Sequence, residues 1–214
     1  MSFGAVLYDL DGTLVDTIGY WMEVYLQTLH DYGVDTDQKE FLELIYTLNA
    51  PFDGVLDHYG IDISKAKELR AMRDKRYTDI LRTKPLWFDG AEELLHKTVE
   101  KYPTAIITGS HRSYVDAIDD QVKIESIIPT IISYDEMEGH SKPSPFGLLL
   151  AAEKLKVDPK GCVYVGDQIF DVEAANNAGM TSCLLWTEFT PSAAGEEADI
   201  SAESIEDLTK LFLL

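Results

Sequence analysis

Two aspartates separated by one residue, Asp9 and Asp11, follow a short apolar run near the N-terminus. The run 5–8 (Ala-Val-Leu-Tyr) is typical of a buried parallel strand, and Gly12 follows as a turn signal. Since alternate residues of a strand share a face, both carboxylates would point into one space. Close carboxylates repel, and a divalent cation with a phosphate would relieve that repulsion. The alternative is a solvated acidic turn, because Asp-Gly is also an ordinary turn sequence.

Three more polar segments follow predicted strands or precede predicted helices. Thr108-Gly109-Ser110 follows an apolar run and offers a hydroxyl and backbone N–H groups to an anion. Lys142 begins a segment whose two prolines hold the backbone extended before a helix. Asp167 ends the run 162–166, and Asp171 lies four residues on, near a helix start where negative charge is favourable. Each segment also has a simpler interpretation. Thr108-Gly109-Ser110 could be a common turn, Lys142 an exposed lysine, and Asp171 an aspartate that only starts a helix.

The stretch 9–17, Asp-Leu-Asp-Gly-Thr-Leu-Val-Asp-Thr, resembles the first motif of the haloacid dehalogenase superfamily in its phosphatase and phosphomutase form. The segments 108–110, 142–145 and 166–171 resemble the second, third and fourth motifs, in that order. Ser141 and Phe146 depart from the third motif, where related sequences usually carry glycine and an acidic residue. The resemblance covers nearly the whole chain, and four motifs in order make coincidence improbable.

The spacing of apolar residues changes along the chain. From 16 to about 82 it is helical, with capping or stop signals at 33, 35–37, 51 and 60 and a long helix from 64 to 81. After 89, helices alternate with strands near 104–108, 130–133, 162–166 and 182–186, while 195–199 is expected to be an acidic loop. The pattern predicts an α/β protein: a Rossmann-like parallel sheet core (1–15 and 89–214) with an inserted four-helix cap domain (16–88). Ligands should bind beyond the carboxyl ends of the central strands.

The composition of the chain excludes some classes of binding partner. The 214 residues carry a formal net charge of -20, which argues against nucleic-acid and anionic-membrane partners. No signal-like start or apolar run of about 20 residues is present, so a cytoplasmic protein, monomer or weak homodimer, is expected. Cys162 and Cys183 each lie in a predicted strand, which favours buried free thiols over a disulfide or metal pair.

The resemblance also implies roles. Asp9 would be the nucleophile that forms an aspartyl-phosphate, and Asp11 the general acid and base. Mg²⁺ would be held by Asp9, the backbone carbonyl of Asp11 and Asp167, with Asp171 orienting Asp167 or a water. A larger set would bind the phosphoryl oxygens: Thr108, Gly109, Ser110 and Lys142.

The expected function is Mg²⁺-dependent hydrolysis of a small phosphate monoester. Dehalogenation is not expected, because that branch lacks the second aspartate. One alternative is a sugar phosphomutase of the β-phosphoglucomutase type, in which a histidine stands where this chain has Trp21, and whose cap-loop arginine has no match near 49–51. Another is a non-catalytic phosphate-ester-binding protein. Arg73 and Arg76 could reach a second anionic group of the substrate, or be solvated charges on a helix face.

Overall fold

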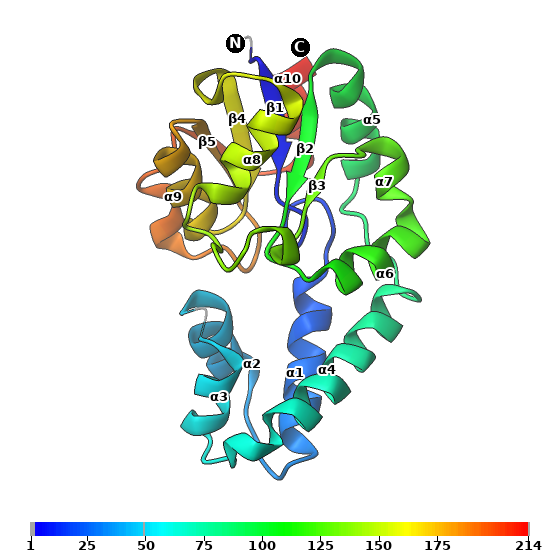
Figure 1. Cartoon of the computed structure of the whole chain (residues 1–214), viewed down its shortest axis with the longest axis vertical. Helices are drawn as coiled ribbons and strands as arrows, with labels where there is room; N and C mark the ends of the chain where they lie inside the picture. Colours follow the sequence, from blue (N-terminus) through cyan, green and yellow to red (C-terminus); the bar gives the residue numbers. More distant parts are fainter. Residues whose placement is uncertain (1–2, 49, 214) are drawn as a thin grey trace. The chain divides into compact units, whose positions relative to one another are not determined.

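The apolar run at the N-terminus forms the buried strand β1 (Ala5–Tyr8). In the computed structural model, which describes residues 3–48 and 50–213, β1 lies inside a six-stranded sheet with the order β3-β2-β1-β4-β5-β6 (Figure 1). Every pair of neighbouring strands is parallel. The predicted α/β class with a parallel sheet is therefore confirmed. Position 49, in the cap loop that has no match to the mutase arginine, lies outside the described residues.

Helices alternate with the strands after β1, as the sequence predicts. The remaining strands are β2 (Thr104–Ile107), β3 (Ile131–Ile132), β4 (Cys162–Gly166), β5 (Thr181–Leu185) and β6 (Ile200–Ala202). The helices of this part are α5 (Ala91–Lys101), α6 (Arg112–Val122), α7 (Ile124–Ile127), α8 (Phe146–Leu155), α9 (Ile169–Ala178) and α10 (Ile205–Leu213). Short 3-10 turns lie at Tyr134–Glu136, Pro159–Gly161 and Ser192–Gly195.

Helices cover both faces of the sheet because neighbouring side chains of each strand point to opposite sides. On one face, Leu7 and Tyr164 pack in a core cluster with residues of α8 and α9. On the other face, the Tyr8 hydroxyl lies 3.1 Å from Oγ1 of Thr98 in α5, and its ring meets Phe212 of α10 edge-on. The carboxyl ends of β1, β2 and β4 are thereby fixed in one layer.

A second unit, Thr17–Lys84, is separate from the unit formed by Met1–Asp16 and Pro85–Leu214. Its described part is helical: α1 (Ile18–His30), α2 (Gln38–Glu40) continuing as the π-helix η1 (Phe41–Thr47), α3 (Phe52–His58), and the 3-10 turn η2 (Ile63–Lys65) leading into α4 (Ala66–Leu81). Asp37 caps α2 as predicted, accepting a hydrogen bond of 3.0 Å from the Glu40 N–H. Tyr25, Phe41 and Leu69 lie in its apolar core.

Two connecting segments join the helical unit to the sheet unit, and within the sheet unit they pair with each other. Val15 and Trp87 form an antiparallel bridge. The Asp16 N–H donates to the Leu86 carbonyl at 2.7 Å, and the Phe88 N–H donates to the Leu14 carbonyl at 3.1 Å. The chain therefore leaves and re-enters the sheet unit at adjacent points. We call this pair of segments, 14–16 and 86–88, the neck.

Some details differ from the sequence predictions. The short edge strand β6 follows the acidic segment 195–199, and α7 and the π-helical turn were not expected. Three-residue edge strands and four-residue helices carry too few residues to show a period. Both cysteines are buried free thiols, as predicted. Among the described residues, no helix is long and apolar enough to cross a membrane.

Candidate active site

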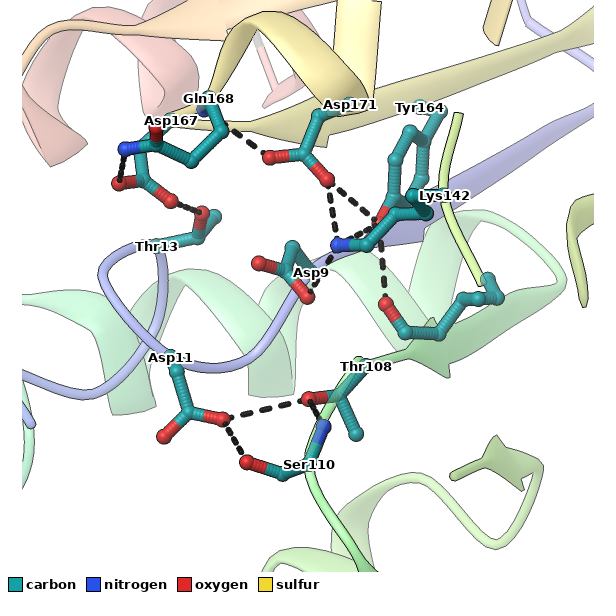
Figure 2. Close-up of polar contacts among 11 residues, drawn as sticks. Asp9, Asp11, Thr13, Thr108, Ser110, Lys142, Tyr164, Asp167, Gln168 and Asp171 are labelled. Atoms are coloured by element: carbon teal, nitrogen blue, oxygen red, sulfur yellow. Dashed lines mark hydrogen bonds and ion pairs between the residues drawn. The ribbon is translucent and has the colours of Figure 1, made fainter. Parts of the chain in front are cut away.

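Asp9 stands directly after β1, and its backbone continues the sheet pairing: its N–H donates to the Val165 carbonyl at 2.7 Å. The residue is 6% exposed. Its Oδ1 lies 2.9 Å from Nζ of Lys142 (Figure 2). Among the described residues this oxygen has the ion pair but no hydrogen bond. A buried carboxylate oxygen with so few partners is free to contact a ligand or metal.

Lys142 reaches the site from the segment before α8 and contacts three groups. Besides Asp9, its Nζ lies 2.5 Å from Oδ1 of Asp171 and 3.1 Å from the hydroxyl of Tyr164. Burial alone would lower the pKa of Lys142, but the neighbouring Asp171 and Asp9 outweigh burial and hold it well above its usual value. The lysine is therefore a fixed positive charge at the carboxyl ends of the strands.

Two more carboxylates come from the end of β4 and the first turn of α9. Asp167 is fully buried and accepts hydrogen bonds from Oγ1 of Thr13 at 3.2 Å and Nε2 of Gln168 at 3.0 Å. Asp171 accepts a bond of 3.0 Å from the Gln168 N–H. Asp9, Asp167 and Asp171 each offer one oxygen, and these atoms all lie within 4.8 Å of one another.

This cluster carries more negative than positive charge. Burial raises the pKa of Asp9 well above its usual value; Lys142 opposes this, while Asp171, Asp167 and Asp11 add to it. An all-oxygen donor set with an unsatisfied buried oxygen fits a hard divalent cation. Gly12 permits the close approach: its φ is +78°, and a Cβ atom there would lie 2.7 Å from Oδ2 of Asp167. The residues present thus fit a divalent metal.

Asp11 belongs to a second group of contacts. Its Oδ2 accepts hydrogen bonds from the Ser110 hydroxyl at 2.7 Å and the Thr108 hydroxyl at 3.2 Å (Figure 2). The Ser110 N–H donates to Oγ1 of Thr108 at 3.0 Å, so the turn after β2 is locked. A Cβ atom on Gly109 would meet nothing within 4 Å, which leaves that backbone open to an anion.

The sequence pattern predicted that strand alternation would point the Asp9 and Asp11 carboxylates into one space, and the structure shows that this reason is wrong. β1 ends at Tyr8, so both aspartates lie beyond the strand, and strand alternation does not orient them. Asp9 faces Lys142, whereas Asp11 faces the turn after β2. The two groups still come from the ends of adjacent strands, because β2 and β4 flank β1 in the sheet.

Sequence reasoning missed three residues that hold the site: Tyr164, Thr13 and Gln168. Thr13 and Gln168 both donate to Asp167, and Tyr164 contacts Lys142. Thr13 and Gln168 lie inside the first and fourth motif segments, which was a usable signal. Tyr164 gave a weaker signal, a polar hydroxyl in an otherwise apolar strand that fills the sheet core.

Arg73 lies in the helical unit and is buried there. Its Nε and Nη2 donate to Oδ1 of Asp74 at 2.9 and 2.7 Å, and Nη1 donates to the Tyr25 hydroxyl at 3.2 Å. Its guanidinium also lies 4.7 Å and 4.6 Å from the ring centroids of Trp21 and Phe52. These contacts give Arg73 a structural role in the helical core.

Arg76, on the same helix, is more exposed. It donates to Thr28 at 3.3 Å and is paired with Asp31, whose pKa is lowered by hydrogen bonds from Arg76 and Gln27. Trp21 packs against Tyr25 and Tyr77 with centroid separations of 5.0 and 4.7 Å and is a partly buried residue at the helical core.

Comparison with known proteins agrees with this geometry. The family model for haloacid dehalogenase-like hydrolases matches residues 6–185. The chain is similar to the pyrophosphatase PpaX of Bacillus velezensis, at 28% identity over 95% of this chain and 94% of the relative.

Two solved structures share the fold. CbbY of Rhodobacter sphaeroides, in complex with phosphate, has a TM-score of 0.82 at 22% identity and covers 96% of each chain. The β-phosphoglucomutase of Clostridium difficile has a TM-score of 0.75 at 18% identity, over 98% of this chain and 97% of that one. The chain therefore belongs to the haloacid dehalogenase-like hydrolases.

Proposed function

We propose that this enzyme hydrolyses a small phosphate monoester, with Mg²⁺, through an aspartyl-phosphate formed on Asp9. One observation carries the proposal: the buried Asp9 carboxylate contacts the Lys142 ammonium group, while Asp11 is held by hydroxyls in the neighbouring turn. A nucleophile and a separate proton donor beside an anion-binding turn are the parts that phosphoryl transfer needs.

Asp9 acts as the nucleophile. One of its oxygens attacks phosphorus, the bond from phosphorus to the ester oxygen breaks, and a mixed anhydride remains on the enzyme. Lys142 holds the carboxylate in place and stabilises negative charge on the phosphoryl oxygens. Water then attacks the phosphorus, releasing inorganic phosphate and restoring the Asp9 carboxylate.

Asp11 moves the protons. It donates a proton to the leaving alkoxide and later takes one from the hydrolytic water, so each turnover restores its starting state. The Ser110 and Thr108 hydroxyls orient its carboxylate through Oδ2. In this proposal Thr108, the Gly109 N–H, Ser110 and Lys142 also bind the phosphoryl oxygens.

In this proposal the metal would be held by Asp9, Asp167 and the backbone carbonyl of Asp11, with Asp171 orienting Asp167 or a water. A bound Mg²⁺ would supply positive charge that offsets the repulsion of the Asp9 carboxylate and the phosphoryl group. Asp171 is suited to an orienting role because its oxygens already accept bonds from Lys142 and the Gln168 N–H.

A small-molecule ester is the substrate, and nucleic acid and membranes are not partners of a chain with a net charge of -20. The core is 1–15 with 89–214, the cap is 16–88, and the protein is a cytoplasmic monomer or weak homodimer. Trp21 and the missing cap-loop arginine favour hydrolysis over mutase chemistry.

The test is phosphate release from sugar phosphates, phosphoglycolate, nucleotides, polyol phosphates and pyrophosphate, the last suggested by the name of the Bacillus relative. Each is assayed with Mg²⁺ and with EDTA, for the parent and Asp9→Asn. Metal-dependent release that Asp9→Asn loses is the expected result. Release that survives Asp9→Asn would remove Asp9 as nucleophile. Isomerisation of a hexose phosphate that requires an added bisphosphate would instead establish a mutase.

A further inference from the structure

Tyr164 lies in the middle of β4 and is 1% exposed. Its side chain is on the face of the sheet covered by α8 and α9. Its hydroxyl donates to the carbonyl of Ile107, the last residue of β2, at 2.9 Å. Because β1 lies between β2 and β4, this bond spans the strand that carries Asp9. Figure 2 shows the hydroxyl beside the Lys142 ammonium group.

The same hydroxyl completes the surroundings of Lys142. An ammonium group has three N–H donors and no acceptor. Nζ donates hydrogen bonds to Asp171 at 2.5 Å and to Tyr164 at 3.1 Å, and it forms an ion pair with Oδ1 of Asp9 at 2.9 Å. Without the phenol oxygen, one donor of a buried cation would lose its partner, and the ammonium could turn away from Asp9.

Tyr164 also fixes the peptide unit at the end of β2. The Ile107 carbonyl and the Thr108 N–H belong to one planar peptide group. Tyr164 donates to the carbonyl, and the Thr108 N–H donates to the Ile132 carbonyl of β3 at 2.9 Å. The plane is thereby held from both sides, which sets the direction of the Thr108 side chain toward Asp11.

The phenol keeps its proton. Burial raises the pKa of Tyr164 well above its usual value, against the opposing effect of Lys142. The group can therefore donate to Ile107 and accept from Lys142 throughout the pH range of an assay. Its oxygen also lies 3.2 Å from Oδ1 of Asp171, a second acceptor for the same proton.

We propose that Tyr164 is a positioning residue for the reaction: one buried hydroxyl orients both Lys142 and the Ile107–Thr108 peptide around the strand that carries the nucleophile. The inference rests on the proposed function, because it assigns Lys142 and Thr108 to the phosphoryl group. Removing the hydroxyl should weaken phosphate binding and slow turnover without removing any group that contacts the substrate.

The test compares Tyr164→Phe with Tyr8→Phe. Both tyrosines are buried in adjacent strands, and each hydroxyl has a buried hydrogen-bond partner, but that of Tyr8 is Thr98 on the opposite face. In the presence of Mg²⁺, Tyr164→Phe is expected to lower kcat/KM by about 10- to 100-fold and to raise the Kd of inorganic phosphate. Tyr8→Phe should leave kcat/KM and the Kd of inorganic phosphate unchanged, and it should lower the stability measured by urea unfolding.

A spectroscopic readout does not depend on turnover. In ¹⁵N-labelled protein the amide resonance of Thr108 should shift in Tyr164→Phe and stay in place in Tyr8→Phe. A Tyr164→Phe variant with parental phosphate affinity and an unmoved Thr108 amide would overturn the inference, as would equal losses of phosphate affinity in the two variants. The proposed function fails separately, if Asp9→Asn retains parental phosphate release.

Discussion

The Oδ1 atom of Asp171 lies closer to Nζ of Lys142, at 2.5 Å, than does the Oδ1 atom of Asp9, at 2.9 Å. The lysine is thus shared between the proposed nucleophile and a carboxylate in the first turn of α9. This sharing holds the ammonium in place even while Asp9 reacts. It also makes Lys142 a counter-charge for two buried acids, with consequences for stability as well as activity.

Replacing Lys142 with methionine should lower the free energy of unfolding by about 3–5 kcal/mol, because two buried carboxylates lose their cation. Urea unfolding of the metal-free protein measures this. Lys210→Met is the control, since Lys210 pairs with Glu206 on the surface, and it should leave the unfolding midpoint unchanged. Equal midpoints for Lys142→Met and the parent would contradict the buried ion pair.

Asp9→Asn should stabilise the metal-free protein at neutral pH. The pKa of Asp9 is raised in the folded state, chiefly by burial, so the unfolded chain releases this proton more readily. The carboxyl therefore favours folding only below its unfolded pKa, near pH 4, and this contribution is lost as the pH rises. The stability gain of Asp9→Asn should grow from pH 4 to 7 in urea unfolding with EDTA. A stability gain of Asp9→Asn that does not change with pH would contradict a raised pKa of Asp9 in the folded state.

Asp11→Asn should reduce turnover of alkyl phosphates by about 10²–10⁴-fold, because both proton transfers are lost. With p-nitrophenyl phosphate, whose leaving group needs no proton, the first step should survive while hydrolysis of the aspartyl-phosphate is slow. Rapid mixing should then show a burst of nitrophenol equal to the enzyme concentration. The absence of a burst, with both substrates slowed equally, would count against the role of Asp11.

A divalent metal should stabilise the fold through the acidic cluster. At 100-fold excess over Kd, Mg²⁺ should add about 2.7 kcal/mol to the free energy of unfolding. Asp167→Asn should abolish most of this increment, since Asp167 is one of the three clustered carboxylates. Thermal unfolding with Mg²⁺ and with EDTA measures the difference. An undiminished Mg²⁺ increment in Asp167→Asn would exclude this residue as a ligand.

Arg73→Lys should destabilise the helical unit by about 1–2 kcal/mol, because lysine cannot stack its charge on Trp21 and Phe52 in the same way. Arg112→Lys, at an exposed pair with Asp116, is the matched control. The loss of stability should appear as faster amide hydrogen exchange in α1. A higher KM in Arg73→Lys, with unchanged exchange, would point instead to a substrate contact.

Most strands of the sheet, and the polar residues at their carboxyl ends, could be predicted from the sequence. Buried parallel strands are short apolar runs that end at turn residues. The candidate catalytic side chains, such as Asp9 and Asp167, directly follow these runs in the sequence. Each side chain could therefore be placed at a strand end before its neighbours were known. The order of the strands was not predicted; the structure places β1 between β2 and β4, which brings the ends of these three strands together.

The missed features depend on contacts between distant residues. The Tyr164 hydroxyl meets a carbonyl 57 positions away and across an intervening strand, which no local pattern encodes. Arg73 has the sequence appearance of a charge on a solvated helix face, yet aromatic residues from α1 and α3 surround it. The strand β6 forms only because β5 offers it a free edge to pair with.

The paired neck has an evolutionary and engineering consequence. Since segments 14–16 and 86–88 are bonded to each other inside the sheet unit, the ends of the intervening 69 positions, 17–85, are already held side by side. Closing such a loop costs little extra entropy as it lengthens. The helical segment is thus an exchangeable module: segments of other lengths and sequences could be grafted between the same two anchor points without changing the strand ends that carry the aspartates.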